Sequence, residues 1–137
     1  MKGLIVGFVS DIMFQTRIEI VAEKLGVKVQ WFDRADQVNG MDVENTLFVE
    51  SVVLDHIIQI EPQLIIFDLG DNSVPWEEWI TLLKKHPEMK LIPVVCFGSH
   101  VDVDTFKIAR QTGANEVLAR SRFVTVLPKL IQRYVNT

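Results

Sequence analysis

The sequence has 137 residues with 14 basic and 18 acidic side chains, so its formal net charge is −4. This length predicts one domain spanning residues 1–137, and an apolar fraction of 48% is sufficient for a hydrophobic core. The single cysteine excludes an internal disulfide framework and a cysteine-based zinc cluster. The acidic balance argues against nucleic-acid binding, and no apolar run is long enough to cross a bilayer. We therefore expect a cytoplasmic protein that binds neither nucleic acid nor membrane.

Short apolar runs alternate with amphipathic segments, which predicts strands alternating with helices. Residues 4–9 form the first apolar run, and its apolar character on both faces indicates a central parallel strand. A helical stripe follows, made of Phe14, Ile18, Val21, Ala22 and Leu25. We expect Ser10 or Asp11 to cap this helix and Gly26 to end it. Residues 27–32 alternate with period two and predict a second strand nearer the sheet edge.

The middle of the chain contains a turn-rich stretch and three further elements. Residues 33–46 are rich in Asp, Asn and Gly without a clear period, which predicts a loop. The apolar spacing over residues 49–60 predicts a second helix, and the buried run 64–68 predicts a third strand. Residues 75–86 predict a third helix, because acidic side chains lie in its first turn and basic ones in its last.

The last third of the chain repeats the alternation twice more. Residues 91–97 predict a fourth strand, and Asp102 is expected to cap a helix that stops at Gly113. Residues 116–119 predict a short fifth strand. The final helix is marked by Val124, Leu127, Ile131 and Tyr134. Because a proline lacks the backbone N–H, we expect Pro128 to lie in the first turn of this helix.

Five strands that alternate with five helices predict a three-layer, doubly wound (flavodoxin-like) α/β fold. The most common arrangement at this length is a parallel sheet of order 2-1-3-4-5 with helices on both faces. Ligands of such sheets bind beyond the carboxyl ends of the strands. The polar residues that leave those ends are Ser10, Asp11, Asp68, Asp71, Ser99 and Arg120.

Three stretches of the chain resemble the response-regulator receiver family of two-component signalling: residues 64–69, 93–99 and 113–120. The resemblance covers most of the chain and is weakest at residues 33–46. It implies that Asp68 stands at the family's phospho-acceptor position. It also implies a magnesium-binding acid pair near Val9 and Ser10, a hydroxyl residue near Gly98 and a lysine at the position of Arg120.

The chain departs from that family pattern at three of these positions. Asp11 is the only acid near the expected pair, so we expect weak magnesium binding through Asp11 and Asp68 at most, and no other cofactor. Gly98 has no hydroxyl, which leaves Ser99 as a displaced substitute. Arg120 keeps the positive charge, but its planar fork suits bidentate carboxylate pairing, so we expect an Arg120–Asp68 ion pair.

Each of these polar residues also has a structural interpretation. Asp11 fits a helix cap better than a metal ligand. Asp71 and Asn72 suit a turn, and Ser99 suits a turn toward Asp102.

The leading hypothesis is a stand-alone, degenerate pseudo-receiver that has no enzymatic activity and acts by binding another signalling protein, with a homodimer as one option. Its remnant phospho-acceptor site would comprise Asp68, Asp11, Ser99 and Arg120. A first alternative is a working phospho-acceptor, in which Asp11 and Asp68, with Asp71 as an optional third ligand, hold the cation and Ser99 supplies the hydroxyl. A second alternative is a flavodoxin-like domain that binds a small ligand in the same cleft.

Three aromatic residues are candidates for an interaction surface. Trp76 and Trp79 share one face of the third predicted helix, where we expect one of them to be partly exposed as an anchor. The family resemblance implies a pairing surface within residues 102–135, to which Tyr134 would contribute.

Overall fold

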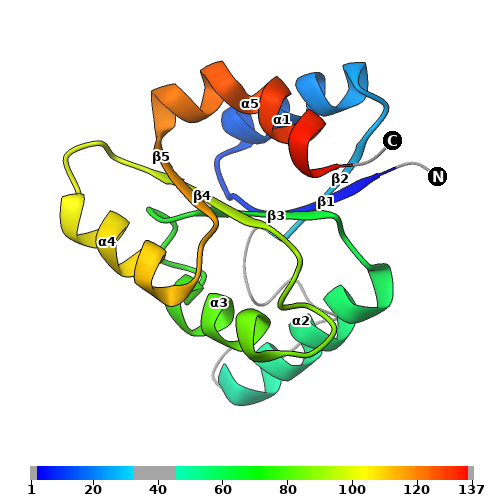
Figure 1. Ribbon diagram of the computed structural model, residues 1–137, viewed down its shortest axis with the longest axis vertical. Helices are drawn as coiled ribbons and strands as arrows, with labels where there is room; N and C mark the ends of the chain where they lie inside the picture. The colour runs from blue at the N-terminus through cyan, green and yellow to red at the C-terminus, as the bar shows by residue number, and fades with distance from the viewer. Residues whose placement is uncertain (1–2, 33–45, 136–137) are drawn as a thin grey trace.

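The computed structural model describes residues 3–32 and 46–135, and over these ranges strands and helices alternate strictly (Figure 1). The strands are β1 (Leu4–Phe8), β2 (Lys28–Trp31), β3 (Leu64–Asp68), β4 (Val94–Gly98) and β5 (Glu116–Ala119). The helices are α1 (Ile12–Lys24), α2 (Thr46–Ile60), α3 (Trp76–Lys85), α4 (Val103–Thr112) and α5 (Arg120–Tyr134). The strands pair in parallel in the order β2-β1-β3-β4-β5, which confirms the predicted fold class.

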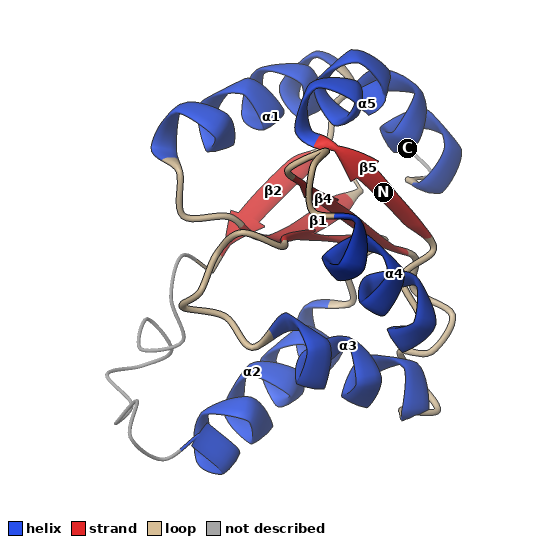
Figure 2. Cartoon of the chain, turned by 90° about the vertical axis from the view of Figure 1, so that its left-hand side faces the viewer, coloured by secondary structure: helices blue, strands red, loops and turns tan. Residues whose placement is uncertain are grey.

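The sheet is the middle of three layers. Helices α1 and α5 cover one face, and α2, α3 and α4 cover the other (Figures 1 and 2). Each face has its own apolar cluster, and residues that alternate along a strand enter different clusters: Ile65 and Phe67 of β3 pack toward α3, whereas Leu64 and Ile66 pack toward α1 and α5. Strands β3 and β4 are buried along their whole length, as expected of parallel strands covered on both sides.

The first helix begins and ends as its sequence predicts. Asp11 is the N-cap of α1, and Gly26, with φ +75°, follows the C-cap Leu25. A second left-handed glycine, Gly113 with φ +128°, caps the C-terminus of α4. Glycine adopts such positive φ values without the steric penalty that a Cβ brings, which explains why both helices stop where they do.

The structure differs from the sequence-based boundaries at the starts of β4 and α2. Strand β4 starts at Val94, and Leu91, which is 86% exposed, lies in the preceding turn. Thr46 already belongs to α2, while the rest of the predicted loop, residues 33–45, lies outside the described residues. Within the described residues no helix combines the length and apolar character needed to cross a membrane.

The prediction for Pro128 was wrong. Helix α5 begins at Arg120, so Pro128 lies in its interior, where it cannot donate a hydrogen bond to the carbonyl four residues earlier. The helix nevertheless continues, because buried apolar residues on both sides of the proline pack against the sheet: Phe123, Leu127, Leu130 and Ile131. Tertiary packing here outweighs the local cost of the proline.

Candidate functional site

The strand register brings the main predicted site residues to one edge of the sheet. Asp68 is the last residue of β3 and pairs with Phe97 of β4. Gly98, the last residue of β4, pairs with Ala119 of β5, and Arg120 follows directly. Because parallel strands end at the same edge, residues 52 positions apart in sequence become neighbours in space.

Asp68 is a buried carboxylate with two identified partners. It is 6% exposed, and its Oδ1 accepts a hydrogen bond from the Gly70 backbone N–H at 2.9 Å. The Nη2 atom of Arg120 lies 3.6 Å from the same oxygen. The predicted Arg120–Asp68 ion pair is therefore confirmed.

Arg120 lies between this carboxylate and two aromatic rings. Its guanidinium carbon is 5.3 Å from the centre of the Phe14 ring and 5.6 Å from the centre of the Phe97 ring. These rings stack on each other at 4.6 Å, which gives the guanidinium a rigid apolar platform. A planar, weakly hydrated guanidinium suits this position better than a compact ammonium group. The Arg120 side chain is 45% exposed, whereas that of Asp68 is 7% exposed, so the arginine partly covers the acid.

The environment of Asp68 raises the pKa of its carboxyl group. Burial raises the pKa of the Asp68 carboxyl, and this effect is larger than the lowering by the Gly70 hydrogen bond and by the positive charge of Arg120. The negative charges of Asp71 and Asp11 raise the pKa further. The arginine therefore offsets only part of the cost of holding a carboxylate at this buried position.

The other predicted polar residues have structural roles. The Asp11 carboxylate accepts hydrogen bonds from the backbone N–H groups of Met13 and Phe14, at 2.9 and 3.2 Å. The Ser99 carbonyl accepts from the Asp102 backbone N–H at 3.0 Å, which makes the expected turn. Asp71 is 7% exposed, and its Oδ1 accepts from the backbone and hydroxyl of Ser73. Its Oδ2 is buried and has no hydrogen-bond partner among the described residues.

Magnesium binding at Asp68 depends on the side chains around it. Among the residues that the structure describes, no three acidic, histidine or cysteine side chains come close enough to hold a metal ion. Asp11 is engaged at the start of α1, and Arg120 places a positive charge next to Asp68. Magnesium usually takes one or two carboxylates together with several waters, and both Asp11 and Asp68 already have partners within the protein.

The position of Gly98 leaves little room for a hydroxyl side chain. A Cβ atom there would lie 3.3 Å from the Phe106 ring and 3.4 Å from the Leu69 Cβ. The Phe106 ring would have to move by a few tenths of an ångström to accept a Cβ, whereas the Leu69 distance is at the limit of ordinary van der Waals contact. The absence of a hydroxyl at this position therefore agrees with the packing around it.

The predicted interaction residues separate into buried and partly exposed groups. The assignment of Trp79 to an interaction surface was wrong, because Trp79 is 2% exposed and stacks edge-on against Phe8 in the core. Trp76 is half-buried and packs at the border of the same cluster, so it is the partly exposed member of the pair. Tyr134 is half-buried, and its hydroxyl donates a hydrogen bond to Glu116. An interaction role for Trp76 and Tyr134 stays a prediction.

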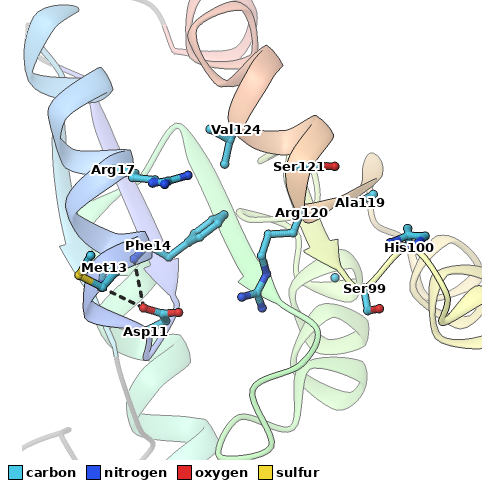
Figure 3. Close-up of a pocket in the computed structure, with 11 residues that line it drawn as sticks. Asp11, Met13, Phe14, Arg17, Ser99, His100, Ala119, Arg120, Ser121 and Val124 are labelled. Atoms are coloured by element: carbon cyan, nitrogen blue, oxygen red, sulfur yellow. Dashed lines mark hydrogen bonds between the residues drawn. The ribbon is translucent and has the colours of Figure 1, made fainter.

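A cavity of about 820 Å³ lies beside Arg120, between α1 and α5 (Figure 3). It contains two of the predicted site residues besides Arg120, namely Asp11 and Ser99. Sequence reasoning did not assign Phe14 or Arg17 to this site. The spacing of three residues from Asp11 to Phe14 and again to Arg17 places all three near one face of α1 and could have indicated them.

Comparison with solved structures identifies the fold. The chain is similar to a chemotaxis response regulator of Vibrio cholerae, with a TM-score of 0.73 and 13% identity over 98% of this chain and 99% of that one. A putative response regulator from Chloroflexus aurantiacus gives a TM-score of 0.73 and 16% identity over 97% and 99% of the two chains. The signal receiver domain of a histidine kinase from Syntrophus aciditrophicus gives 0.74 and 16% over 96% and 89%.

These similarities show that the chain has the fold of response-regulator receiver domains, as the sequence resemblance indicated. No family model and no curated protein matches the sequence itself.

Proposed function

We propose that the chain is a degenerate receiver domain of two-component signalling, in which the Arg120–Asp68 pair takes the place of a phosphorylation switch. The observation that supports this most directly is the position of the Arg120 guanidinium, 3.6 Å from the Asp68 carboxylate and above the Phe14 and Phe97 rings. Signalling would then proceed through binding to another protein, without catalysis by this chain.

The chemistry of aspartate phosphorylation explains why this arrangement is unfavourable for it. The nucleophile is an ionised carboxylate, and burial together with the neighbouring acids raises the pKa of the Asp68 carboxyl above its ordinary value. The incoming phosphoryl group brings more negative charge, which a divalent cation would have to neutralise. Among the described residues no three metal-ligating side chains come together, which supports the proposal.

Acetyl phosphate provides a direct test. We expect no phosphoryl mass increase on intact protein incubated with acetyl phosphate and millimolar magnesium. We also expect no saturable change in the NMR signals of residues 66–71 when magnesium is titrated alone. Asp68→Asn serves as the baseline for modification at other sites.

The variant Arg120→Lys tests whether the guanidinium group of Arg120 prevents phosphorylation of Asp68. Lysine retains the charge but loses the planar contact with the two rings, and we expect it to permit more modification of Asp68 than Arg122→Lys does. Stoichiometric modification of Asp68 in the unaltered chain would overturn the proposal in favour of a working phospho-acceptor.

A further inference from the structure

The cavity between α1 and α5 has the size of a ligand site. Its volume of about 820 Å³ lies within the range of roughly 300–1,000 Å³ that small-molecule sites usually occupy. Its walls come from α1, from the turn after β4 and from the start of α5. These segments meet only through the fold, so a ligand there would contact three separate parts of the chain.

Two arginine side chains face this cavity with hydrogen-bond donors that the protein does not use. Figure 3 shows Arg17 reaching from α1 toward α5 and Arg120 descending into the space beside Phe14. Arg17 makes no hydrogen bond, ion pair or ring contact with any other described residue. Arg120 has its ion pair with Asp68 and its ring contacts, but it donates no hydrogen bond within the described residues.

The charge of this cavity contrasts with that of the whole chain. The net charge of the protein is −4, whereas two guanidinium groups lie along this cavity beside the Asp11 carboxylate, and the buried Asp68 carboxylate lies 3.6 Å from Arg120. The Asp11 carboxylate is already hydrogen-bonded to two backbone N–H groups at the start of α1. Guanidinium groups are well suited to hold phosphate oxygens, because their N–H donors match the geometry of the anion.

The remaining walls combine an apolar surface with hydroxyl groups. Phe14 and Val124 face each other across the cavity in Figure 3, and Met13, which is 78% exposed, lies at its border. Ser99 and Ser121 add hydroxyl groups near Arg120. A ligand that matches both features carries an anionic group and a flat apolar group.

We propose that this cavity binds a small phosphate monoester attached to an aromatic group. The phosphate would lie between Arg17 and Arg120, and the ring would pack against Phe14 and Val124. This inference goes beyond the proposed receiver role, since it involves neither modification of Asp68 nor a protein partner.

Phenyl phosphate is a suitable probe, followed by two-dimensional amide NMR of the full chain. We expect saturable shifts of the amide signals of Phe14, Arg17 and Ser121. The affinity should be at least about tenfold higher than for inorganic phosphate, which lacks the aromatic ring, or for benzyl alcohol, which lacks the anionic group. Benzoate tests the anion class, and we expect it to bind more weakly than phenyl phosphate.

A matched pair of arginine variants completes the test. Arg17→Gln should weaken phenyl phosphate binding about tenfold, as expected for the loss of one charge-assisted contact. Arg122→Gln removes the same charge from an exposed position of α5 outside the cavity and should leave the affinity unchanged. Both arginines are exposed, so neither change threatens the fold.

Three results would overturn the proposal. The first is an equal loss of phenyl phosphate affinity in Arg17→Gln and Arg122→Gln. The second is binding of inorganic phosphate as tight as that of phenyl phosphate, and the third is binding of benzoate as tight as or tighter than that of phenyl phosphate. Because magnesium and acetyl phosphate are absent from this experiment, its outcome is independent of whether Asp68 can be modified.

Discussion

Two basic side chains connect separate elements at opposite edges of the sheet, and they do so differently. The amino edge is the edge of the sheet at which the parallel strands begin. There, the Lys84 Nζ atom donates to the Ile92 carbonyl at 2.9 Å and to the Asn115 side-chain oxygen at 2.8 Å. The same Asn115 oxygen accepts from the Val94 backbone N–H at 2.8 Å, so α3 is joined to the starts of β4 and β5. At the carboxyl edge, where the parallel strands end, the Arg120 Nη2 atom lies 3.6 Å from the Asp68 Oδ1 atom.

The two basic side chains differ in the number and length of their contacts with hydrogen-bond acceptors of the protein. Lys84 makes two hydrogen bonds at normal distances, and burial lowers its pKa. Arg120 has one longer ion pair and stacking contacts, is half exposed, and lies beside a cavity. The amino edge is therefore a structural connection, whereas the carboxyl edge retains donors for a ligand or a partner.

The largest effect is expected at the amino edge. Lys84→Met should lower the free energy of unfolding by about 2 kcal/mol, because two oxygens lose a charged donor while the apolar stem of the side chain is kept. Urea unfolding followed by circular dichroism measures this difference. Lys85→Met, at the exposed neighbouring position, is the control and should change stability by less than about 0.5 kcal/mol. Equal effects of the two variants would show that Lys84 is not a structural connection.

A smaller effect is expected at the carboxyl edge. Arg120→Ala should destabilise the protein by about 1 kcal/mol, because the ion pair is only partly shielded from water and the contact with the Phe14 and Phe97 rings is lost. The same change should raise the pKa of Asp68, since Arg120 lowers it in the intact chain. A carboxyl-carbon NMR titration of Asp68 measures this shift. Arg122→Ala should change neither quantity, and an unchanged Asp68 titration in Arg120→Ala would contradict the pairing.

Most of the fold could be predicted because its signals are local. The apolar runs of β3 and β4 and the helix-ending Gly26 and Gly113 each act within a few residues, and their alternation leaves few topologies. Pro128 was mispredicted for the opposite reason. The energy that keeps α5 helical around it comes from packing against distant strands, which a local rule does not include.

The candidate site could be predicted only in part. The sequence resemblance placed Asp68 and Arg120 together, and the residue type at position 120 indicated an ion pair. The spacing of Phe14 and Arg17 places them near one face of α1, but their position relative to Arg120 depends on how α1 and α5 lie on the sheet. The burial of Trp79 rather than Trp76 likewise depends on the exact rotation of α3.

The smallest effect concerns how stability at the carboxyl edge depends on pH. The pKa of Asp68 is raised in the folded protein above its ordinary value of 3.8, so the folded state keeps a proton at pH values where the unfolded chain has lost it. Above the folded pKa, the buried charge therefore costs stability, and this cost is relieved as the pH falls toward 3.8. Asp68→Asn removes the charge while keeping an acceptor for Gly70.

We accordingly expect Asp68→Asn to be about 0.5 kcal/mol more stable than the unaltered chain at neutral pH, because the loss of the Arg120 partner offsets much of the gain. This advantage should shrink as the pH is lowered and the Asp68 carboxyl becomes protonated. Urea unfolding of both proteins at a series of pH values measures the trend, with Asp55→Asn on the exposed side of α2 as the control. An advantage that grows on acidification would mean that Arg120 stabilises the ionised carboxylate more than burial disfavours it. In that case the carboxyl edge would be a structural connection like the one made by Lys84.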